Sequence, residues 1–524
     1  MKNNNKQKIV IVGGGTAGWM TAAAFARLLV SDSTEVTLIE SEQISTVGVG
    51  EATVPHLKFF NHKLGINEDL FMEQCHATYK LGIEFVNWSK HFDSYIHPFA
   101  DLGEPIHGVP FHQVWLQYQQ QNPQSSLSDF SLAIQASYLN KFSHPTTETS
   151  SVYSSYSYAY HIDATSYAHF LSSFAQENGV TRIEGIVKEV TTSETGDIDK
   201  LILDNGNQVT ADLFIDCSGF RSLLLGQTLG VSFEDWSEYL PCDRAIAAPS
   251  ARKAVIKPYT RSIAKEAGWQ WQIPLTHRTG NGYVYSSKFQ SDEDALASFI
   301  KQVDGPLESE PKILKFQAGK RSQSWQSNCV AIGLSSGFLE PLESTSIYLI
   351  QSAIMKLIDL LPHDISENQK LLMPRTEFNR YMNNELIKIR DFLILHYHIT
   401  GRTDTQFWQY CSNMKVPESL MKQLSLFKAT GQVKQYQHGM FHEPSWLAVY
   451  YGQGLKPNQI DPRVSGLVAN GVLALFPKLA QEVQDAANSM TSHESALQSI
   501  KDRRSKNQCN QKQVLPTLSL YGRY

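Results

Sequence analysis

Apolar and polar positions in the first 40 residues follow two different periods. KIVIV (8–12) is a run of β-branched residues typical of a buried strand, and GGGTAG follows it as a glycine turn. WMTAAAFARLLV (19–30) then favours a helix rich in alanine, and EVTLIE (35–40) favours a second strand. This order of strand, turn, helix and strand predicts a βαβ unit.

The rest of the chain divides into a mixed middle and a helical end. Strand-like segments occur at 183–190, 199–209 and 211–219, with a helical segment at 165–179. After residue 343 the pattern changes to long amphipathic helical runs, at 347–362 and 377–397. Segment 121–156 is rich in Gln, Ser, Thr and Tyr, which predicts a surface excursion, and the polar end of the chain is expected to fray. We therefore expect an α/β unit continuous with a mostly helical module.

Composition and charge narrow the classes of function. Hydrophobic residues make up 42% and charged residues 19%, a globular composition. The 46 Lys and Arg nearly balance 51 Asp and Glu without a basic block, which argues against nucleic acid or an anionic membrane as partner. No long apolar run predicts a membrane span, and glycines 13–15 interrupt the only stretch that resembles a secretory signal. A small ligand is the expected partner.

The six cysteines are scattered, without a CxxC pair and without histidines at zinc-site spacing. This pattern favours neither a disulfide framework nor a metal site, and a reducing cytoplasm is the default location.

Three glycines give the clearest candidate for chemistry. Gly13, Gly15 and Gly18 form GxGxxG between a predicted strand and a helix that begins near Thr16 and Ala17. The first glycine permits the turn, the second lets a pyrophosphate approach, and the third allows close helix packing. Glu40 ends the second strand, where a carboxylate can bind an adenosine ribose. The alternative is a plain glycine turn, but the complete context favours a dinucleotide site. DLFIDCSGFRS (212–222) resembles a strand and turn of flavin monooxygenases, which favours FAD over NAD.

A third piece, residues 329–350, predicts a strand, a glycine-containing loop and a helix that begins near Ser344 and Thr345. The N–H groups of such a helix start can bind an anion, either the carbonyl edge of a flavin or a halide. An ordinary capped helix that binds no anion explains the same pattern equally well.

Five ordered blocks carry a family resemblance. GGGTAGW (13–19), GVGEATVP (48–55), ATYKLGIEF (77–85), GWQWQIPL (268–275) and FLEPLESTSI (338–347) resemble the flavin-dependent tryptophan halogenases. The WxWxIP block, Trp269 to Pro274, is the family's hallmark. Weaker similarity continues in HYHITGRTDTQFW (396–408) and SWLAVYYGQGLKP (445–457).

The resemblance implies an FAD-dependent halogenase with a flavin monooxygenase type of Rossmann-like domain. A separate flavin reductase would supply reduced FAD, whose reaction with oxygen gives a flavin hydroperoxide that oxidises halide to hypohalous acid. This acid would pass through an internal tunnel to an electron-rich, indole-like substrate.

Lys80 matches the catalytic lysine, which holds the hypohalous acid or forms a haloamine; a solvated surface charge is the alternative. Glu343 matches the essential glutamate, which polarises the electrophile or accepts the substrate's proton; a capping carboxylate is the alternative.

The resemblance assigns further residues to three sites. The halide site would comprise Thr345 and Ser346; tryptophan-specific members have Gly at position 346, and a side chain there is expected to restrict the backbone and change halide preference. FAD contacts beyond the glycine motif would come from Gly50, Glu51 and Ala52 of a strap between the two sites, and from Val187, Leu334 and Ile347. The substrate or tunnel residues would be Trp269, Trp271, His97, Phe99 and Trp446, each with core packing as the alternative.

The expected domains are an FAD-binding halogenase core over 1–350, a helical substrate-binding module over 351–500, to which residues 90–170 of the core contribute, and a polar C-terminal tail over 501–524. The segment 445–457 resembles a less characterised branch of the family, so free tryptophan is not the expected substrate. A homodimer is compatible with the sequence. Two rival interpretations stay open: a flavin hydroxylase, which needs no Lys80, and a non-catalytic flavin-binding protein, which needs neither Lys80 nor Glu343.

Overall fold

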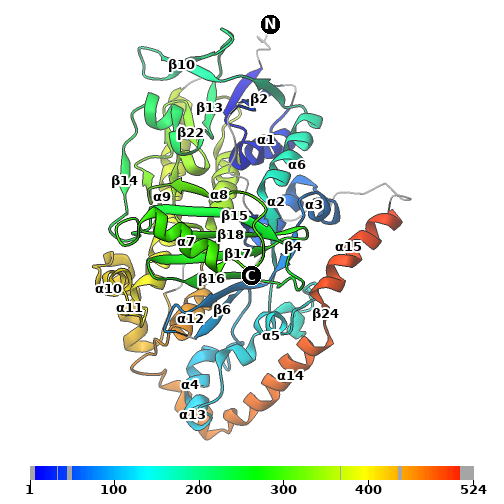
Figure 1. Cartoon of the computed structure of the whole chain (residues 1–524), viewed down its shortest axis with the longest axis vertical. Coiled ribbons are helices and arrows are strands. Elements are labelled where there is room, and N and C mark those ends of the chain that lie inside the picture. Colours follow the sequence, from blue (N-terminus) through cyan, green and yellow to red (C-terminus); the bar gives the residue numbers. More distant parts are fainter. Residues whose placement is uncertain are drawn as a thin grey trace.

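The computed structural model describes residues 6–31, 33–43, 50–91, 93–365, 368–434 and 439–507. Its first sheet has six strands in the order β21-β22-β13-β1-β2-β9. The bounds are Trp325–Gln326 (β21), Cys329–Ala331 (β22), Leu213–Asp216 (β13), Gln7–Val12 (β1), Thr34–Glu40 (β2) and Thr181–Glu184 (β9). All neighbouring pairs are parallel except β21 and β22. The sheet lies in the upper part of Figure 1.

The predicted βαβ unit is confirmed at the centre of this sheet. Helix α1 (Thr16–Leu28) joins β1 to β2, which pair in parallel from Gln7 and Thr34 onwards. Every residue from Gly18 to Ala26 is buried, because α1 lies against the sheet on one side and α6 and α8 on the other. Alanines along this helix permit close approach on all sides.

The second large sheet has seven strands in the order β19-β15-β18-β17-β16-β5-β6. The bounds are Lys312–Lys315 (β19), Arg244–Ala251 (β15), Arg278–Tyr285 (β18), Gly268–Pro274 (β17), Thr260–Ala264 (β16), Gly82–Val86 (β5) and Ser94–Pro98 (β6). It crosses the middle of Figure 1. Only β16 and β5 pair in parallel. A small sheet of β3 (Gly50–Ala52), β8 (Ala159–Asp163) and β4 (Thr78–Lys80) packs against β17 and β18.

Three further groups of strands are shorter, and within the described residues seven α-helices precede residue 345. The strands are β10 (Val187–Thr192), β11 (Ile198–Leu203), β12 (Gln208–Val209), β14 (Phe233–Asp235), β20 (Gly319–Arg321), β23 (Gly337–Phe338), and the pair β7 (Lys141–Phe142) and β24 (Thr491–Ser492). Besides α1, the helices are α2 (His56–Leu64), α3 (Glu68–Gln74), α4 (Phe111–Gln121), α5 (Leu132–Tyr138), α6 (Ala164–Glu177) and α7 (Asp292–Gln302).

Helices dominate the C-terminal part, as the pattern predicts. They are α8 (Thr345–Leu360), α9 (Leu372–His398), α10 (Gln406–Asn413), α11 (Glu418–Thr430), α12 (Glu443–Gly452), α13 (Arg463–Ala469), α14 (Phe476–Ser489) and α15 (His493–Asn507). Helix α15 extends into the segment expected to fray, and residues 508–524 lie outside the described residues. Figure 1 shows α14 and α15 along one side of the molecule, with α15 reaching α3.

The prediction of a surface excursion at 121–156 is wrong for its central part. Leu132, Ala133 and Ala136 of α5 are fully buried, and Phe142 stacks on Tyr79 with ring centroids 3.9 Å apart. A few apolar residues spaced along one helical face are sufficient to bury a short helix within a polar segment.

The hydrophobic cores join residues far apart in sequence. One core contains Ile9 and Ile500, and another extends from Ala52 to Phe476, so the sheets and the C-terminal helices share their interiors. The five described cysteines are all free and buried, and Cys509 lies outside the described residues.

Within the described part, no single helix is long and apolar enough to cross a membrane, although the bent pair Arg463–Ala469 and Val472–Ser489 meets the criterion by length and composition alone. Nor does any cluster of three or more His, Cys, Asp or Glu there have the arrangement of a metal site.

Candidate active site

The glycine loop between β1 and α1 has the geometry that a dinucleotide phosphate requires. Gly13 has φ +115°, and a Cβ there would lie 2.3 Å from the carbonyl oxygen of Cys217. A Cβ on Gly18 would lie 1.8 Å from the oxygen of Gly13, whereas Gly15 faces open space. Thr16 and Ala17 begin α1, and no described side chain caps this helix. Its first N–H groups can therefore bind a phosphate, so these residues fit FAD.

Glu40 lies over this loop, as predicted, but its carboxylate already has partners. Its Oε1 accepts a 2.6 Å hydrogen bond from Nε of Arg182, and its Oε2 accepts one of 3.3 Å from Nε1 of Trp19. Because a carboxylate offers about four acceptor positions, Glu40 can still bind a ribose hydroxyl.

Three of the other predicted FAD contacts lie near β1 and α1, whereas the strap belongs to the small sheet beside β17 and β18. Val187 packs in one core with Val10 and Val12 of β1, and Ile347 is buried in the first turn of α8. Leu334 is 39% exposed, and a Cβ on its neighbour Gly333 would lie 2.8 Å from Cβ of Ala17. The strap residues Gly50, Glu51 and Ala52 form β3, paired with β8. Burial raises the pKa of Glu51 to about 7. Residues 48 and 49 of the strap block lie outside the described residues.

Lys80 is fully buried at the end of β4. Its Nζ donates hydrogen bonds of 2.9 Å to the carbonyl oxygen of Thr53 and of 2.8 Å to Oγ of Ser344. It therefore joins the chain just after the strap to the start of α8. Burial lowers its pKa to about 7, with the charge of Glu343 opposing this effect. The ammonium also lies 5.0 Å from the ring centroid of Phe99.

Glu343 is held between two buried imidazoles. Nδ1 of His97 lies 3.0 and 2.9 Å from its two oxygens, and Nε2 of His396 lies 2.8 Å from Oε1. Nδ1 of His396 also lies 2.8 Å from the carbonyl oxygen of Phe392, so both ring nitrogens of His396 lie near acceptor oxygens. Burial disfavours the carboxylate, but His97 and His396 outweigh it and lower the pKa of Glu343 to about 2.

The start of α8 has an unusual cap. Ser344 has φ +60°, and its hydroxyl contacts Lys80 instead of capping the helix. Thr345 is fully buried, and its Oγ1 has no hydrogen-bond partner among the described residues. A hydroxyl and free N–H groups thus converge where the halide was predicted.

The expectation that Ser346 restricts the backbone is wrong. Ser346 lies in the regular first turn of α8, and the residue with positive φ is Ser344. A serine at 346 therefore adds a hydroxymethyl group without backbone strain.

The paired tryptophans lie on β17. Trp269 is buried and donates a 2.7 Å hydrogen bond to Oε2 of Glu340. The ring of Trp271 lies 6.0 Å from that of Trp269 and covers Gly282 so closely that a Cβ there would be 1.9 Å from it. Tyr397 donates to the same oxygen of Glu340 at 2.6 Å, and burial raises the pKa of Glu340 to about 7.

Two of the five predicted substrate or tunnel residues contact Lys80 or Glu343, and Trp446 lies farther out, beyond Phe392. His97 contacts Glu343, Phe99 contacts Lys80, and the ring of Trp446 lies 5.0 Å from Phe392, which lies 5.8 Å from His97. The indole N–H of Trp446 is buried without a partner among the described residues. His97 is therefore a partner of the glutamate as well as an aromatic neighbour.

Sequence reasoning missed four residues of this site: Thr53, Glu340, Ser344 as a partner of Lys80, and His396. Glu340 and Ser344 lie within the recognised block 338–347, so their positions were available, but their partners were not. His396 is the first residue of the weakly similar block 396–408, which assigned it no role, and it lies on the buried face of a helix.

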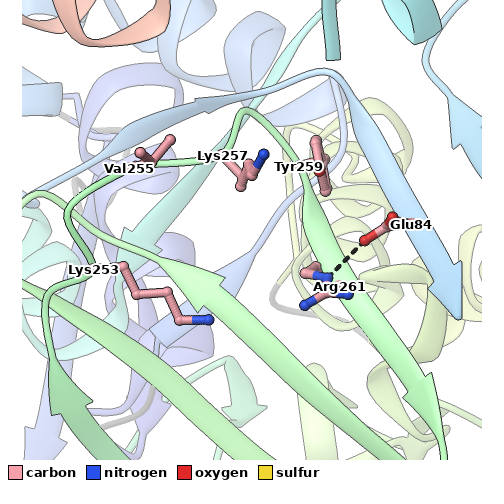
Figure 2. Close-up of a pocket in the computed structure, with 6 residues that line it drawn as sticks. All are labelled: Glu84, Lys253, Val255, Lys257, Tyr259 and Arg261. Carbon is pink, nitrogen blue, oxygen red and sulfur yellow. Dashed lines mark hydrogen bonds and ion pairs between the residues drawn. The ribbon is translucent and has the colours of Figure 1, made fainter. Parts of the chain in front are cut away.

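A separate open pocket of about 400 Å³ lies beside β16 and β5. Figure 2 shows its lining residues, which are Glu84, Lys253, Val255, Lys257, Tyr259 and Arg261, with a 2.6 Å ion pair between Arg261 and Glu84. Neither Lys80 nor Glu343 lines it, and both are shielded from solvent. The predicted catalytic site therefore lies in the interior around Lys80 and Glu343, and this pocket is separate from it.

Comparisons with known proteins agree with this geometry. A family model described as tryptophan halogenase matches residues 8–468. The chain is 37% identical over 485 residues to tryptophan 6-halogenase SttH of Streptomyces toxytricini, covering 87% of this chain and 90% of that protein. It is similar to the solved structure of BrvH, a flavin-dependent halogenase from Brevundimonas sp. BAL3, with TM-score 0.90, 41% identity and coverage of 95% and 100% of the two chains. Xcc4156, a flavin-dependent halogenase from Xanthomonas campestris, gives TM-score 0.90, 39% identity and coverage of 95% and 98%.

Proposed function

The chain belongs to the tryptophan halogenase family, and from this premise we propose how its active site divides the work. The protein is an FAD-dependent halogenase, an oxidoreductase that halogenates an aromatic substrate. This membership sets aside both rival interpretations, the flavin hydroxylase and the non-catalytic flavin-binding protein.

The cofactor site consists of the glycine loop, Glu40 and the strap. When bound, reduced FAD supplies with oxygen the oxidation that converts a halide ion to hypohalous acid. A separate flavin reductase delivers the reduced cofactor, because the chain has only one dinucleotide fingerprint. The start of α8 binds the halide through its N–H groups and the buried hydroxyl of Thr345.

Lys80 delivers the electrophile. This role rests on the burial of Lys80 and Glu343 together in the interior. The ammonium of Lys80 is held there by hydrogen bonds to Thr53 and Ser344. An ammonium has three N–H donors, and two have oxygen partners among the described residues. The third can hold hypohalous acid, and a pKa of about 7 also makes the neutral amine accessible for a haloamine.

Glu343 completes the substitution. In the overall reaction the O–X bond of hypohalous acid and an aromatic C–H bond break, a C–X bond forms, and the hydroxide leaves with the ring proton as water. The carboxylate stays ionised because His97 and His396 face it, so it can polarise the electrophile or accept that proton.

The substrate is an electron-rich, indole-like aromatic. The rings of His97, Phe99 and Trp446 suit a flat apolar ring, and the segment 445–457 departs from members that bind free tryptophan. Bromide is the preferred halide, because it is more weakly hydrated than chloride and easier to oxidise. We also propose a cytoplasmic location, and a homodimer as the form in solution.

Mass spectrometry of indole-type compounds tests this function. The protein is incubated with FAD, a flavin reductase, a nicotinamide cofactor and each halide in turn. Halogenated indole is the expected product with wild type, and Lys80→Ala should abolish it while leaving flavin reoxidation and hypohalous acid formation intact. Normal product from Lys80→Ala would contradict the role of Lys80.

A further inference from the structure

The strand that carries Lys80 is held at each of its three residues. In β4, Thr78 Oγ1 donates a 2.7 Å hydrogen bond to the carbonyl oxygen of Pro274, the last residue of the tryptophan-bearing strand β17. Tyr79 donates its backbone N–H to Nε2 of His493 at 3.2 Å. Only Lys80 has its side chain in the active site, so the other two residues anchor the strand.

The hydrogen bonds around His161 allow a single proton arrangement. The one proton of Thr78 Oγ1 is directed to the Pro274 carbonyl, so Nδ1 of His161, 2.8 Å away, must donate to Thr78. Nε2 of His161 lies 3.0 Å from Oγ1 of Thr260 and accepts from it in the neutral ring. Burial, with the charge of Lys80, lowers the pKa of His161 well below its usual range, in agreement with a neutral imidazole.

The same reasoning determines the tautomer of His493. A backbone N–H can only donate, so Nε2, which receives the N–H of Tyr79, carries no proton. Nδ1 lies 3.0 Å from the carbonyl oxygen of Ile256, which can only accept, so the single proton is on Nδ1. Burial lowers the pKa of His493 to about 4, so this neutral form persists at neutral pH.

His493 reaches the active-site strand from the other end of the chain. It is 1% exposed at the first turn of α15, and its own N–H donates 2.9 Å to the oxygen of Asn140, continuing the pairing of β24 with β7. Farther along α15, Arg503 forms two hydrogen bonds of 2.8 and 2.6 Å with the carboxylate of Asp69 in α3. The C-terminal helix is therefore firmly attached on both sides of this contact.

We propose that His493 is a positioning residue for halogen transfer, which fixes the strand β4 and thereby the Nζ of Lys80. This rests on the proposed role of Lys80. An imidazole satisfies the edge N–H of β4 without bringing a second positive charge near the buried ammonium. A displaced Nζ would still sit beside hypohalous acid but would deliver it inefficiently, because misplacement by about 1 Å can reduce a rate by about a hundredfold.

The test compares three variants of the full-length protein loaded with FAD. His493→Leu removes both hydrogen bonds, His493→Gln retains one donor and one acceptor, and His169→Gln is the matched control on the exposed face of α6. The readouts are the ratio of halogenated indole to FADH₂ oxidised, the amount of hypohalous acid trapped in solution, and the Kd for FAD.

His493→Leu should lower the product ratio about tenfold or more, with trapped hypohalous acid increased and the Kd for FAD unchanged. His493→Gln should recover most of the ratio, and His169→Gln should match wild type. A folded His493→Leu protein with a wild-type ratio would overturn the proposal, as would a loss that glutamine does not restore.

If His493→Leu does not fold, ¹⁵N-histidine NMR of the wild-type protein decides the matter. Assigned by comparison with His493→Gln, His493 should show a neutral ring protonated on Nδ1 at neutral pH; an imidazolium or an Nε2–H tautomer would overturn the proposal. The Lys80→Ala variant distinguishes failure of the proposed function from failure of the inference about His493. If that variant still forms product, the proposed function fails; if only the His493 results disagree, this inference alone fails.

Discussion

Replacing Lys80 by methionine should abolish halogenation and at the same time stabilise the protein. Methionine retains most of the volume and adapts to its surroundings, while it removes the buried charge. The two effects have opposite signs because the same ammonium that performs the chemistry is destabilised by its burial. Catalytic need and folding stability therefore conflict at this single side chain.

The magnitude follows from the two protonation states. Lys80 binds a proton with pKa 10.5 in the unfolded chain and about 7 in the folded protein, where burial is the main cause and Glu343 opposes it. At ~1.4 kcal/mol per pKa unit, the charged form costs the folded state about 5 kcal/mol. This penalty is complete below pH 7 and fades as the pH rises towards 10.5, because the unfolded chain then binds more protons. Leaving the Thr53 carbonyl without its donor costs about 1–3 kcal/mol, so a net gain of about 2–4 kcal/mol remains.

Two measurements on Lys80→Met check this reasoning. Thermal unfolding near neutral pH should give a higher Tm than wild type, and Lys80→Arg, which keeps a charge in the same place, should not. In single turnovers with reduced FAD, bromide and indole, flavin reoxidation and trapped hypohalous acid should persist while brominated indole disappears. A Tm several degrees below wild type would refute the energetic argument, and brominated product at a near wild-type rate would refute the catalytic one.

Four further outcomes are expected. The protein should oxidise NADH or NADPH rapidly only when a flavin reductase is added; rapid turnover without one would contradict the need for a partner. Gly18→Ala places a methyl group 1.8 Å from the Gly13 oxygen and should weaken FAD binding in a fluorescence titration, whereas Gly466→Ala, which faces open space, should not. In equal chloride and bromide with indole and tryptophan together, brominated indole should dominate, and chlorinated tryptophan as the main product would contradict both preferences. The depressed pKa of Glu343 stabilises the fold above pH 4.5 and is lost as the pH falls towards 2, so Glu343→Gln should flatten that part of an acid-unfolding curve.

The local pattern of apolar and polar residues was sufficient to predict the helices and strands that carry the sequence motifs. The period change at residues 8–40 predicted β1, α1 and β2, and the block 338–347 predicted a helix that begins at Thr345, as found. These predictions succeed because strand and helix periods, glycine turns and capping residues act over a few neighbouring positions.

The partners within the site depend on distant contacts and could not be predicted in the same way. His396 lies 53 residues after Glu343 in sequence, and His493 lies 414 residues from Tyr79. Each is a histidine on a helix, and its burial signals only a core position. The error over Ser346 also concerns a distant contact, because the residue with positive φ is Ser344, whose hydroxyl accepts a hydrogen bond from Lys80.

The burial of the cysteines has a consequence for an enzyme that makes a strong oxidant. Hypohalous acid attacks thiolates fastest, and burial raises the pKa of Cys75, Cys217, Cys242, Cys329 and Cys411, so each stays a shielded thiol. Two of the thioethers, in contrast, lie at the surface, with Met373 72% and Met421 46% exposed. Hypohalous acid that escapes into solution therefore reaches these surface methionines before any of those five cysteines. The amount of methionine sulfoxide at the two positions then measures how much oxidant has escaped during the lifetime of each molecule.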